Sequence, residues 1–173
     1  MKFRFKIKNS VQIKVMRTLQ KGGGDLHRAF LKYFTVFVLG ALIYGCIEIG
    51  ARGYTHITMG LLGGMSMTAI HITNDQRRQG LNYFLQIGMI TFFITSIEFI
   101  AGEILNVQLG MNIWDYSDMP YNLDGQICLP FVGFWIILSV IGIALDDFIR
   151  WKLFDEDKNF NYLHFHGAKQ QKI

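Results

Sequence analysis

The sequence predicts an all-α integral membrane protein, a bundle of four transmembrane helices. Half of the 173 residues are hydrophobic (51%), and charged residues make up only 17%. The charges gather at the two ends, since nine of the seventeen Lys and Arg residues precede residue 33 and five follow residue 149. Between the basic ends lie four apolar runs, each close to the roughly 20 residues that a helix needs to cross a bilayer. This pattern is typical of membrane proteins and leaves room for one domain.

Residues 1–25 are predicted to form a basic, amphipathic, cytoplasmic segment. Residues 2–8 alternate apolar and cationic side chains, and residues 11–19 space apolar side chains at helical intervals. Such a segment can lie on the inner leaflet with its cations toward anionic lipid headgroups. A solvated tail whose charge only sets the topology is the alternative. Gly22–Gly24 is expected to break any helix here, and Asp25 to cap the next one.

The transmembrane domain is expected over residues 26–149, followed by a basic cytoplasmic tail over 150–173. Its predicted spans are residues 26–50, 54–73, 81–105 and 127–148. Pro130 falls in the first turn of the last span, where a missing N–H does no harm.

The second span contains no Asp, Glu, Lys or Arg. Gly60 and Gly64, with Gly63 beside them, form a small-xxx-small pattern that allows close helix packing. This face could serve inside the bundle or between copies, so a homo-oligomer or a membrane complex is an expected form of the protein.

The distribution of cations predicts the orientation. Arg77 and Arg78 follow the second span, whereas the connection after the third span has no Lys or Arg. The positive-inside rule therefore places both termini in the cytoplasm and the loop bearing Trp114 outside the cell membrane. The basic ends are expected to meet anionic inner-leaflet lipids, and no nucleic-acid partner is expected.

Two glutamates lie in similar contexts fifty positions apart. Glu48 stands near the end of the first span, and Glu98 near the outer end of the third. The repeated helix–loop–helix order suggests an internal two-hairpin repeat, in which the two carboxylates would approach each other near the outer leaflet. A carboxylate within a span normally faces the protein interior. The alternative is that each lies at the wet interface, bonded to loop N–H groups or to Arg52.

Histidine and cysteine offer weaker signals. His56 could join the two glutamates in a metal or proton site, although a single interfacial histidine is more often a hydrogen-bonding residue. His164 and His166 form an H-x-H pattern in the tail, a weak metal signal. Cys46 and Cys128 could pair, but two free thiols are the more ordinary case.

The loop between the third and fourth spans is long, and it carries three aspartates with no Lys or Arg. Trp114, Asp115, Tyr116 and Asn122 are its candidate binding residues. A loop of this length often acts as a lid or a re-entrant plug, whereas an aromatic belt with a solvated turn is the plainer interpretation.

These motifs resemble a known family. The residues that carry the resemblance are Glu98, Trp114-Asp115-Tyr116-Ser117, Asn122-Leu123-x-Gly125-x-Ile127-x-Leu129 and Trp135. They look like the signature of the bacterial "putative ABC transporter permease" family, also called CmpB-type or type IV, over about residues 33–150. The family tends to have an Arg-Gly-x-Leu-x-Gly-Pro run at the start of the second span, but residues 57–65 lack the Arg and the Pro.

Three functional hypotheses follow. The first is a transport or channel-like component with an intramembrane carboxylate site near the outer leaflet, which the family resemblance favours. The second is a membrane-embedded enzyme acting on a lipid or lipid-linked substrate through Glu48, Glu98 and Asp115. The third is an interaction or regulatory module. The sequence identifies no cofactor and has no G-x-x-x-x-G-K-[ST] nucleotide-binding motif.

Overall fold

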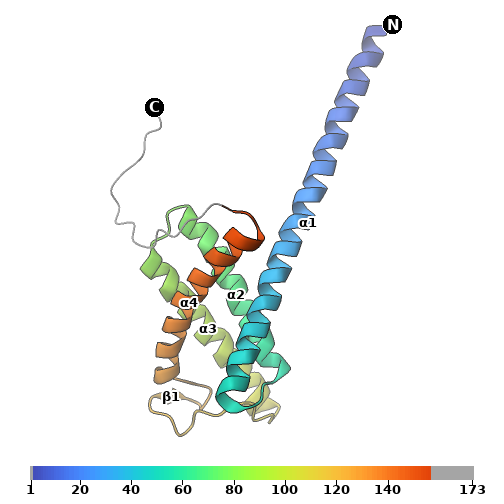
Figure 1. Cartoon of the computed structure of the whole chain (residues 1–173). Coiled ribbons are helices and arrows are strands. Elements are labelled where there is room, and N and C mark those ends of the chain that lie inside the picture. The colour runs from blue at the N-terminus through green and yellow to red at the C-terminus, as the bar shows by residue number, and fades with distance from the viewer. Residues whose placement is uncertain (1, 157–173) are drawn as a thin grey trace. The chain divides into compact units, whose positions relative to one another are not determined.

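The computed structural model describes the backbone of residues 2–156 and the side chains of residues 26–156. The chain is helical (Figure 1). Its elements are α1 (Lys2–Arg52), α2 (Ile57–Arg78), α3 (Tyr83–Gly102), the π-helix η1 (Glu103–Gln108), the strands β1 (Asn122–Leu123) and β2 (Ile127–Cys128), and α4 (Leu129–Leu153). The strands pair antiparallel, with Asn122 opposite Cys128 and Leu123 opposite Ile127.

The chain divides into two compact units, with the boundary between Thr35 and Val36 inside α1. The first unit holds the N-terminal part of α1. The second holds the rest of α1 and all the other elements. Within the second unit, the β1–β2 hairpin and the α1–α2 connection lie at one end, called here the hairpin end (Figure 1). The α2–α3 connection and the last turns of α4 lie at the other, called the α2–α3 end.

The expected helix break at Gly22–Gly24 is wrong. The helix α1 continues through all three glycines, and Asp25 therefore lies within it rather than capping a new helix. The physical reason is that glycine lowers helix propensity by only about 1 kcal/mol relative to alanine and does not prevent helical backbone geometry. The side chains of residues 1–25, on which the amphipathic prediction depends, lie outside the described part, as do residues 157–173 of the basic tail.

Within the part of the chain that the structure describes, three helices are long and apolar enough to cross a membrane: Leu26–Arg52, Tyr83–Gln108 and Leu129–Leu153. They correspond to the first, third and fourth predicted spans. The last begins two residues later than expected, because residues 127 and 128 form β2. The second predicted span corresponds to α2, which is not among the three. A fourth crossing and the two-hairpin repeat therefore remain predictions.

Local sequence sets the helix starts. The side chain of Asn82 accepts hydrogen bonds from the backbone N–H groups of Phe84 and Leu85, at 2.9 and 3.2 Å, and so caps α3. Pro130 occupies the first turn of α4, as predicted.

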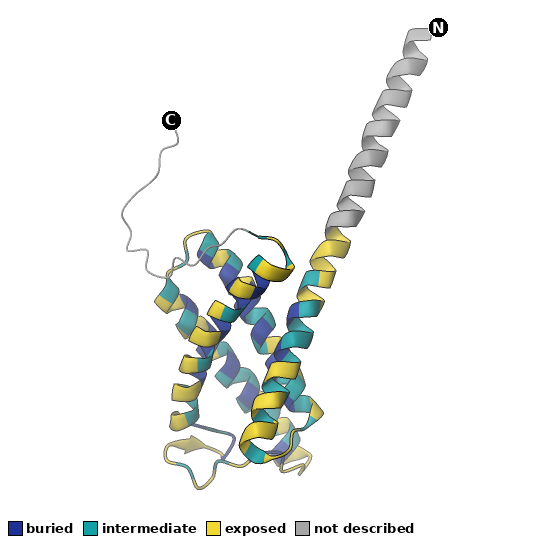
Figure 2. Ribbon diagram, viewed as in Figure 1, coloured by how far each residue is buried: buried dark blue, intermediate teal, exposed yellow. Residues whose placement is uncertain are grey.

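The buried residues of the second unit lie on the helix faces that point toward one another, and exposed residues lie on the outward faces (Figure 2). Many of the exposed residues are large and hydrophobic. Ile90, Ile143 and Trp135 are buried in the main cluster. In contrast, Phe92 and Ile137, on the same helices, are 75% and 58% exposed. Soluble monomers rarely expose continuous apolar surface of this kind, whereas lipid-facing helices do. The exposed hydrophobic side chains therefore indicate that the bundle lies in a membrane.

Close packing joins α1 to α2 through glycines. A Cβ added at Gly63 would lie against Tyr44 and 2.9 Å from the carbonyl oxygen of Gly40, and a Cβ added at Gly64 would meet the ring of Phe37 at 2.7 Å. Gly60 is looser, with its nearest neighbour at 3.8 Å. The tight contact of the predicted glycine pattern thus centres on Gly63 and Gly64.

Candidate functional site

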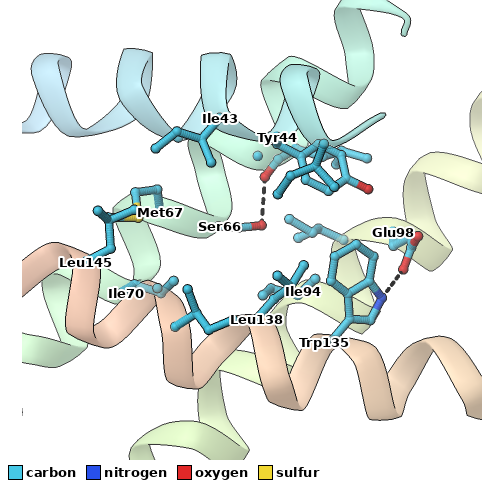
Figure 3. A pocket seen from close by; sticks show the side chains of 17 residues that line it. Ile43, Tyr44, Ser66, Met67, Ile70, Ile94, Glu98, Trp135, Leu138 and Leu145 are labelled. Atoms are coloured by element: carbon cyan, nitrogen blue, oxygen red, sulfur yellow. Dashed lines mark hydrogen bonds between the residues drawn. The ribbon is translucent and has the colours of Figure 1, made fainter. Parts of the chain in front are cut away.

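Glu98 is a buried carboxylate between α3 and α4. Its side chain comes from α3 and is only 3% exposed. Trp135, on α4, donates its indole N–H to Oε2 of Glu98 across 2.6 Å (Figure 3). The hydroxyl of Tyr116 lies 3.5 Å from Oε1. Among the residues with described side chains, none forms an ion pair with Glu98. The carboxylate is therefore held by neutral donors alone.

A chain of aromatic rings adjoins Glu98. Tyr44 from α1 lies 5.8 Å from Trp135, measured between ring centroids, and Phe134 lies 5.7 Å from Trp135. Phe131 continues the chain, 6.2 Å from Phe134 and 4.5 Å from Tyr116. The two rings that hydrogen-bond Glu98, those of Trp135 and Tyr116, are thus joined by tilted and edge contacts through two phenylalanine rings of α4.

A cavity of about 120 Å³ adjoins the same carboxylate (Figure 3). Its wall is mostly aliphatic, with polar groups contributed by Tyr44, Ser66, Glu98 and Trp135. The hydroxyl of Ser66 already donates to the carbonyl of Leu62 at 2.7 Å. The apolar lining includes Ile43, Ile47, Met67, Ile94, Leu138 and Ile141. A space of this character suits an apolar group, with Glu98 as its most polar neighbour.

The loop after α3 closes the hairpin end. Asn106, in the π-helix, donates to the carbonyl of Trp114 and to the side chain of Gln126, both at 2.9 Å, and accepts from the N–H of Ile113 at 2.7 Å. Trp114 is 5% exposed and donates to the carbonyl of Gln126. Trp114 is therefore a buried anchor of the loop and not part of an exposed aromatic belt. This anchoring positions Tyr116 over Glu98.

Asp115 and Asn122 shape the loop itself. Asp115 accepts hydrogen bonds from the hydroxyl and the N–H of Ser117, at 2.5 and 2.8 Å, and these bonds hold the pKa of the Asp115 carboxyl below its usual range. Asn122 donates to the carbonyls of Ser117 and Met119. No described contact joins either side chain to Glu98.

Tyr116 remains a hydrogen-bond donor at neutral pH. Burial, and next the charge of Glu98, raise the pKa of the Tyr116 phenol. The neutral hydroxyl can therefore keep donating toward the glutamate.

Glu48 is compensated by a cation. Its carboxylate forms an ion pair with Arg52, one turn later on α1, and Arg52 also donates to the carbonyl of Ile113 at 2.9 Å. For Glu48, the structure therefore shows the alternative given by the sequence analysis, in which the carboxylate pairs with Arg52. Of the predicted site residues, the structure thus joins Glu98 to Tyr116 by a hydrogen bond, while Glu48 has a different partner.

His56 caps a helix. Its Nδ1 lies 2.9 Å from the hydroxyl of Thr58 and accepts from the backbone N–H of Thr58 at the start of α2. Among the described residues, no three His, Cys, Asp or Glu side chains gather as metal ligands. His164 and His166 lie outside the described residues. Cys46 and Cys128 are both free thiols, the first exposed and the second buried.

A second polar cluster, which the sequence analysis did not predict, lies at the α2–α3 end. His71 on α2 and Asp146 on α4 are fully buried and lie 2.6 Å apart, from Nδ1 to Oδ1. Arg150 donates to Asp146 at 2.7 Å and to the carbonyl of His71 at 2.6 Å. We call this cluster the polar network at the α2–α3 end. Its further members are Asn74, Asp75, Arg77, Gln86, Asp147 and Glu156. The network fastens α2 to α3 and α4.

The sequence did contain a signal for this network. Asp146 and Asp147 lie within the fourth predicted span, and acids in an apolar run are the same feature that singled out Glu98. In the sequence, Arg77 and Arg150 indicate only the orientation of the chain, and their partners cannot be identified without the helix packing.

Taken together, the long apolar helices of the described residues and their exposed hydrophobic side chains define a membrane protein. Residues 52–156 match the family described as putative ABC-transporter type IV. The matched residues make up more than half of the chain. The chain belongs to this family, as the resemblance implied. No curated protein and no solved structure matches the chain.

Proposed function

We propose that this protein is a membrane component of a transport system, and that Glu98 forms part of its solute-binding site. The observation that carries the proposal is a buried carboxylate, with no cationic partner among the described side chains, at the wall of a cavity. Ionisable groups at membrane depth are costly and commonly mark solute or ion pathways. The family description points the same way, as analogy.

In this proposal α2 is a fourth membrane crossing, both termini are cytoplasmic, and the hairpin end is outside. The crowding of cations at the chain ends and after α2 supports this orientation. The packing of α2 against α3 and α4, with its polar side chains satisfied by α4, supports its place in the bundle. Glu98 would then lie near the outer leaflet.

A binding component fits the cavity better than an open channel. The cavity wall is mostly aliphatic, and it separates Glu98 from the polar network at the α2–α3 end. A water-filled path would need polar groups along that stretch. A solute therefore has to be bound and carried rather than pass through a continuous aqueous pore.

The arrangement favours binding over acid–base catalysis. An enzyme using Glu48, Glu98 and Asp115 would need these carboxylates within reach of one reacting group. Glu48 is paired with Arg52, and Asp115 is exposed and bonded to Ser117. Glu98 is thus the carboxylate to which we assign solute binding.

A stabilisation screen tests the proposal. The purified protein is heated with separate solute classes: inorganic cations, small amines, organic acids, sugars and amphiphiles. Wild type is expected to show a raised melting temperature with at least one class, since a ligand that binds only the folded state stabilises it. Glu98→Gln is expected to lose that shift, and Asp118→Asn, at an exposed loop position, to keep it. The proposal is wrong if every stabilising class acts equally on wild type and Glu98→Gln.

A further inference from the structure

We propose that the ligand of the Glu98 site is an amphiphile with an ammonium head and a single apolar tail. The inference rests on the proposed function and names the class of solute. It is carried by three features that meet at one place: a carboxylate lacking a positive partner among the described side chains, a chain of aromatic rings, and an apolar cavity.

The charge requires a positive head group or a proton. Glu98 receives one hydrogen bond of 2.6 Å, from Trp135, and a long one of 3.5 Å from Tyr116. Neutral donors do not cancel the charge of an ionised Glu98, and a buried charge is costly unless the group is paired or takes up a proton. An ammonium group on a ligand would supply the missing partner. An anionic head group would instead add like-charge repulsion at the same point.

The aromatic rings favour an alkylated ammonium in particular. Cations are attracted to the faces of Trp and Tyr rings, and quaternary ammonium ligands are commonly recognised in this way. Tyr44 and Trp135 both line the cavity, and Trp135 also bonds the carboxylate. A head group at Glu98 would therefore lie near two aromatic side chains as well as an opposite charge.

The cavity accounts for the tail. A bare metal ion would need several oxygen ligands and no apolar space, and among the described residues no group of three acids or histidines supplies them. Ile43 and Ile47 on α1 and Ile141 on α4 line the cavity and are also exposed on the surface of the bundle. In a membrane this opening faces lipid, so an amphiphile could enter sideways with its tail in the hydrocarbon.

The test compares head groups on a constant tail. The full chain is placed in nanodiscs of phosphatidylglycerol, which has no ammonium group, and binding of radiolabelled dodecyltrimethylammonium is measured against empty nanodiscs. Its uncharged isostere, in which carbon replaces the nitrogen, is the matched probe. Wild type is expected to bind the cation saturably and at least about tenfold more tightly than the isostere. Choline, the head without the tail, is expected to bind at least about a hundredfold more weakly, because burial of the tail is lost.

Variants locate the effect. Glu98→Gln is expected to remove the preference for the cation while leaving isostere binding unchanged, and Glu98→Asp to keep part of it. Ser66→Leu fills the cavity and is expected to weaken both ligands. Asp118→Asn, which removes an acidic group at an exposed loop position, is the control and is expected to bind like wild type.

The comparison of probes on wild type needs no variant to fold. Equal affinity for the cation and the isostere overturns the inference. If the affinities are equal but the solute screen finds another class whose binding depends on Glu98, the proposed function still stands. If the screen finds no such class, the proposed function and the inferred ligand are both wrong. Dodecylphosphocholine identifies the source: binding at least as tight as that of dodecyltrimethylammonium indicates a single-tailed phosphocholine lipid, and weaker binding indicates a free cationic amphiphile.

Discussion

The indole N–H of Trp135 donates to Oε2 of Glu98 across 2.6 Å and so joins α4 to α3 inside the bundle. Both side chains are at most 5% exposed. Hydrogen bonds to charged groups are stronger than neutral ones, and the cost is greatest when one partner is removed and the other stays buried. This pair therefore acts as a structural link and as part of the proposed binding site.

Trp135→Phe is expected to destabilise the protein by about 1–3 kcal/mol, since it leaves the Glu98 carboxylate without its short hydrogen bond. Unfolding by denaturant in mild detergent measures the change. In the double variant with Glu98→Gln, the second substitution is expected to cost less than it does alone. Strict additivity of the two changes would contradict a direct coupling.

Disrupting the polar network at the α2–α3 end is expected to lower stability by a larger amount. Asp146→Ala removes the partner of His71, Asn74 and Arg150 at once. Breaking a buried ion pair by deleting one member typically costs about 3–5 kcal/mol, because the other charge stays buried. Asp118→Ala, at an exposed loop position, is the control and is expected to change stability by less than about 0.5 kcal/mol. Equal effects in the two variants would show that the network contributes little to stability.

The contact between α1 and α2 predicts a difference between neighbouring glycines. Gly63→Ala places a methyl group against Tyr44 and 2.9 Å from the Gly40 carbonyl oxygen, so the helices must separate, at a cost of about 1–3 kcal/mol. Gly60→Ala has open space to 3.8 Å and is expected to be neutral or slightly stabilising, because alanine favours helix. Thermal unfolding of the two variants, measured side by side, checks the ranking.

The sequence predicted the helices well because hydrophobic run length is a strong local signal. It also singled out Glu98, which the structure buries on one of the long apolar helices, while its place within a membrane stays a prediction. It did not predict which glutamate lacks a counter-charge, because Arg52 lies one turn from Glu48 but could equally have faced away. The partners Trp135 for Glu98 and His71 for Asp146 are 37 and 75 residues distant in sequence. Such pairs depend on how the helices pack against one another, and the periodicity within one helix does not predict that packing.

The loop turn gives a prediction about pH. The pKa of Asp115 is held low by the hydroxyl and the N–H of Ser117, so the contribution of these bonds is fully present above the unfolded-state pKa and is lost as pH falls through the lower folded-state pKa. Ser117→Ala removes one of the two donors and is expected to raise the Asp115 pKa part of the way to its ordinary value. Titration followed by carboxyl-carbon NMR measures both proteins. An unchanged pKa in the variant would contradict the assignment of the hydroxyl.

The orientation of the chain can be tested at the same loop. Asp118 is exposed in the connection between η1 and β1, and the proposal places this loop outside the cell. In a chain carrying Cys46→Ser and Cys128→Ser, Asp118→Cys is expected to react with a membrane-impermeant maleimide on intact cells. Gln79→Cys, in the α2–α3 connection, is the matched position on the opposite side and is expected to react only after the cells are opened. Labelling of both cysteines on intact cells would be incompatible with α3 crossing the membrane between them, whereas labelling of Gln79→Cys alone would invert the topology. In that inverted case Glu98 and its cavity would open near the inner leaflet, and the amphiphile would have to come from there.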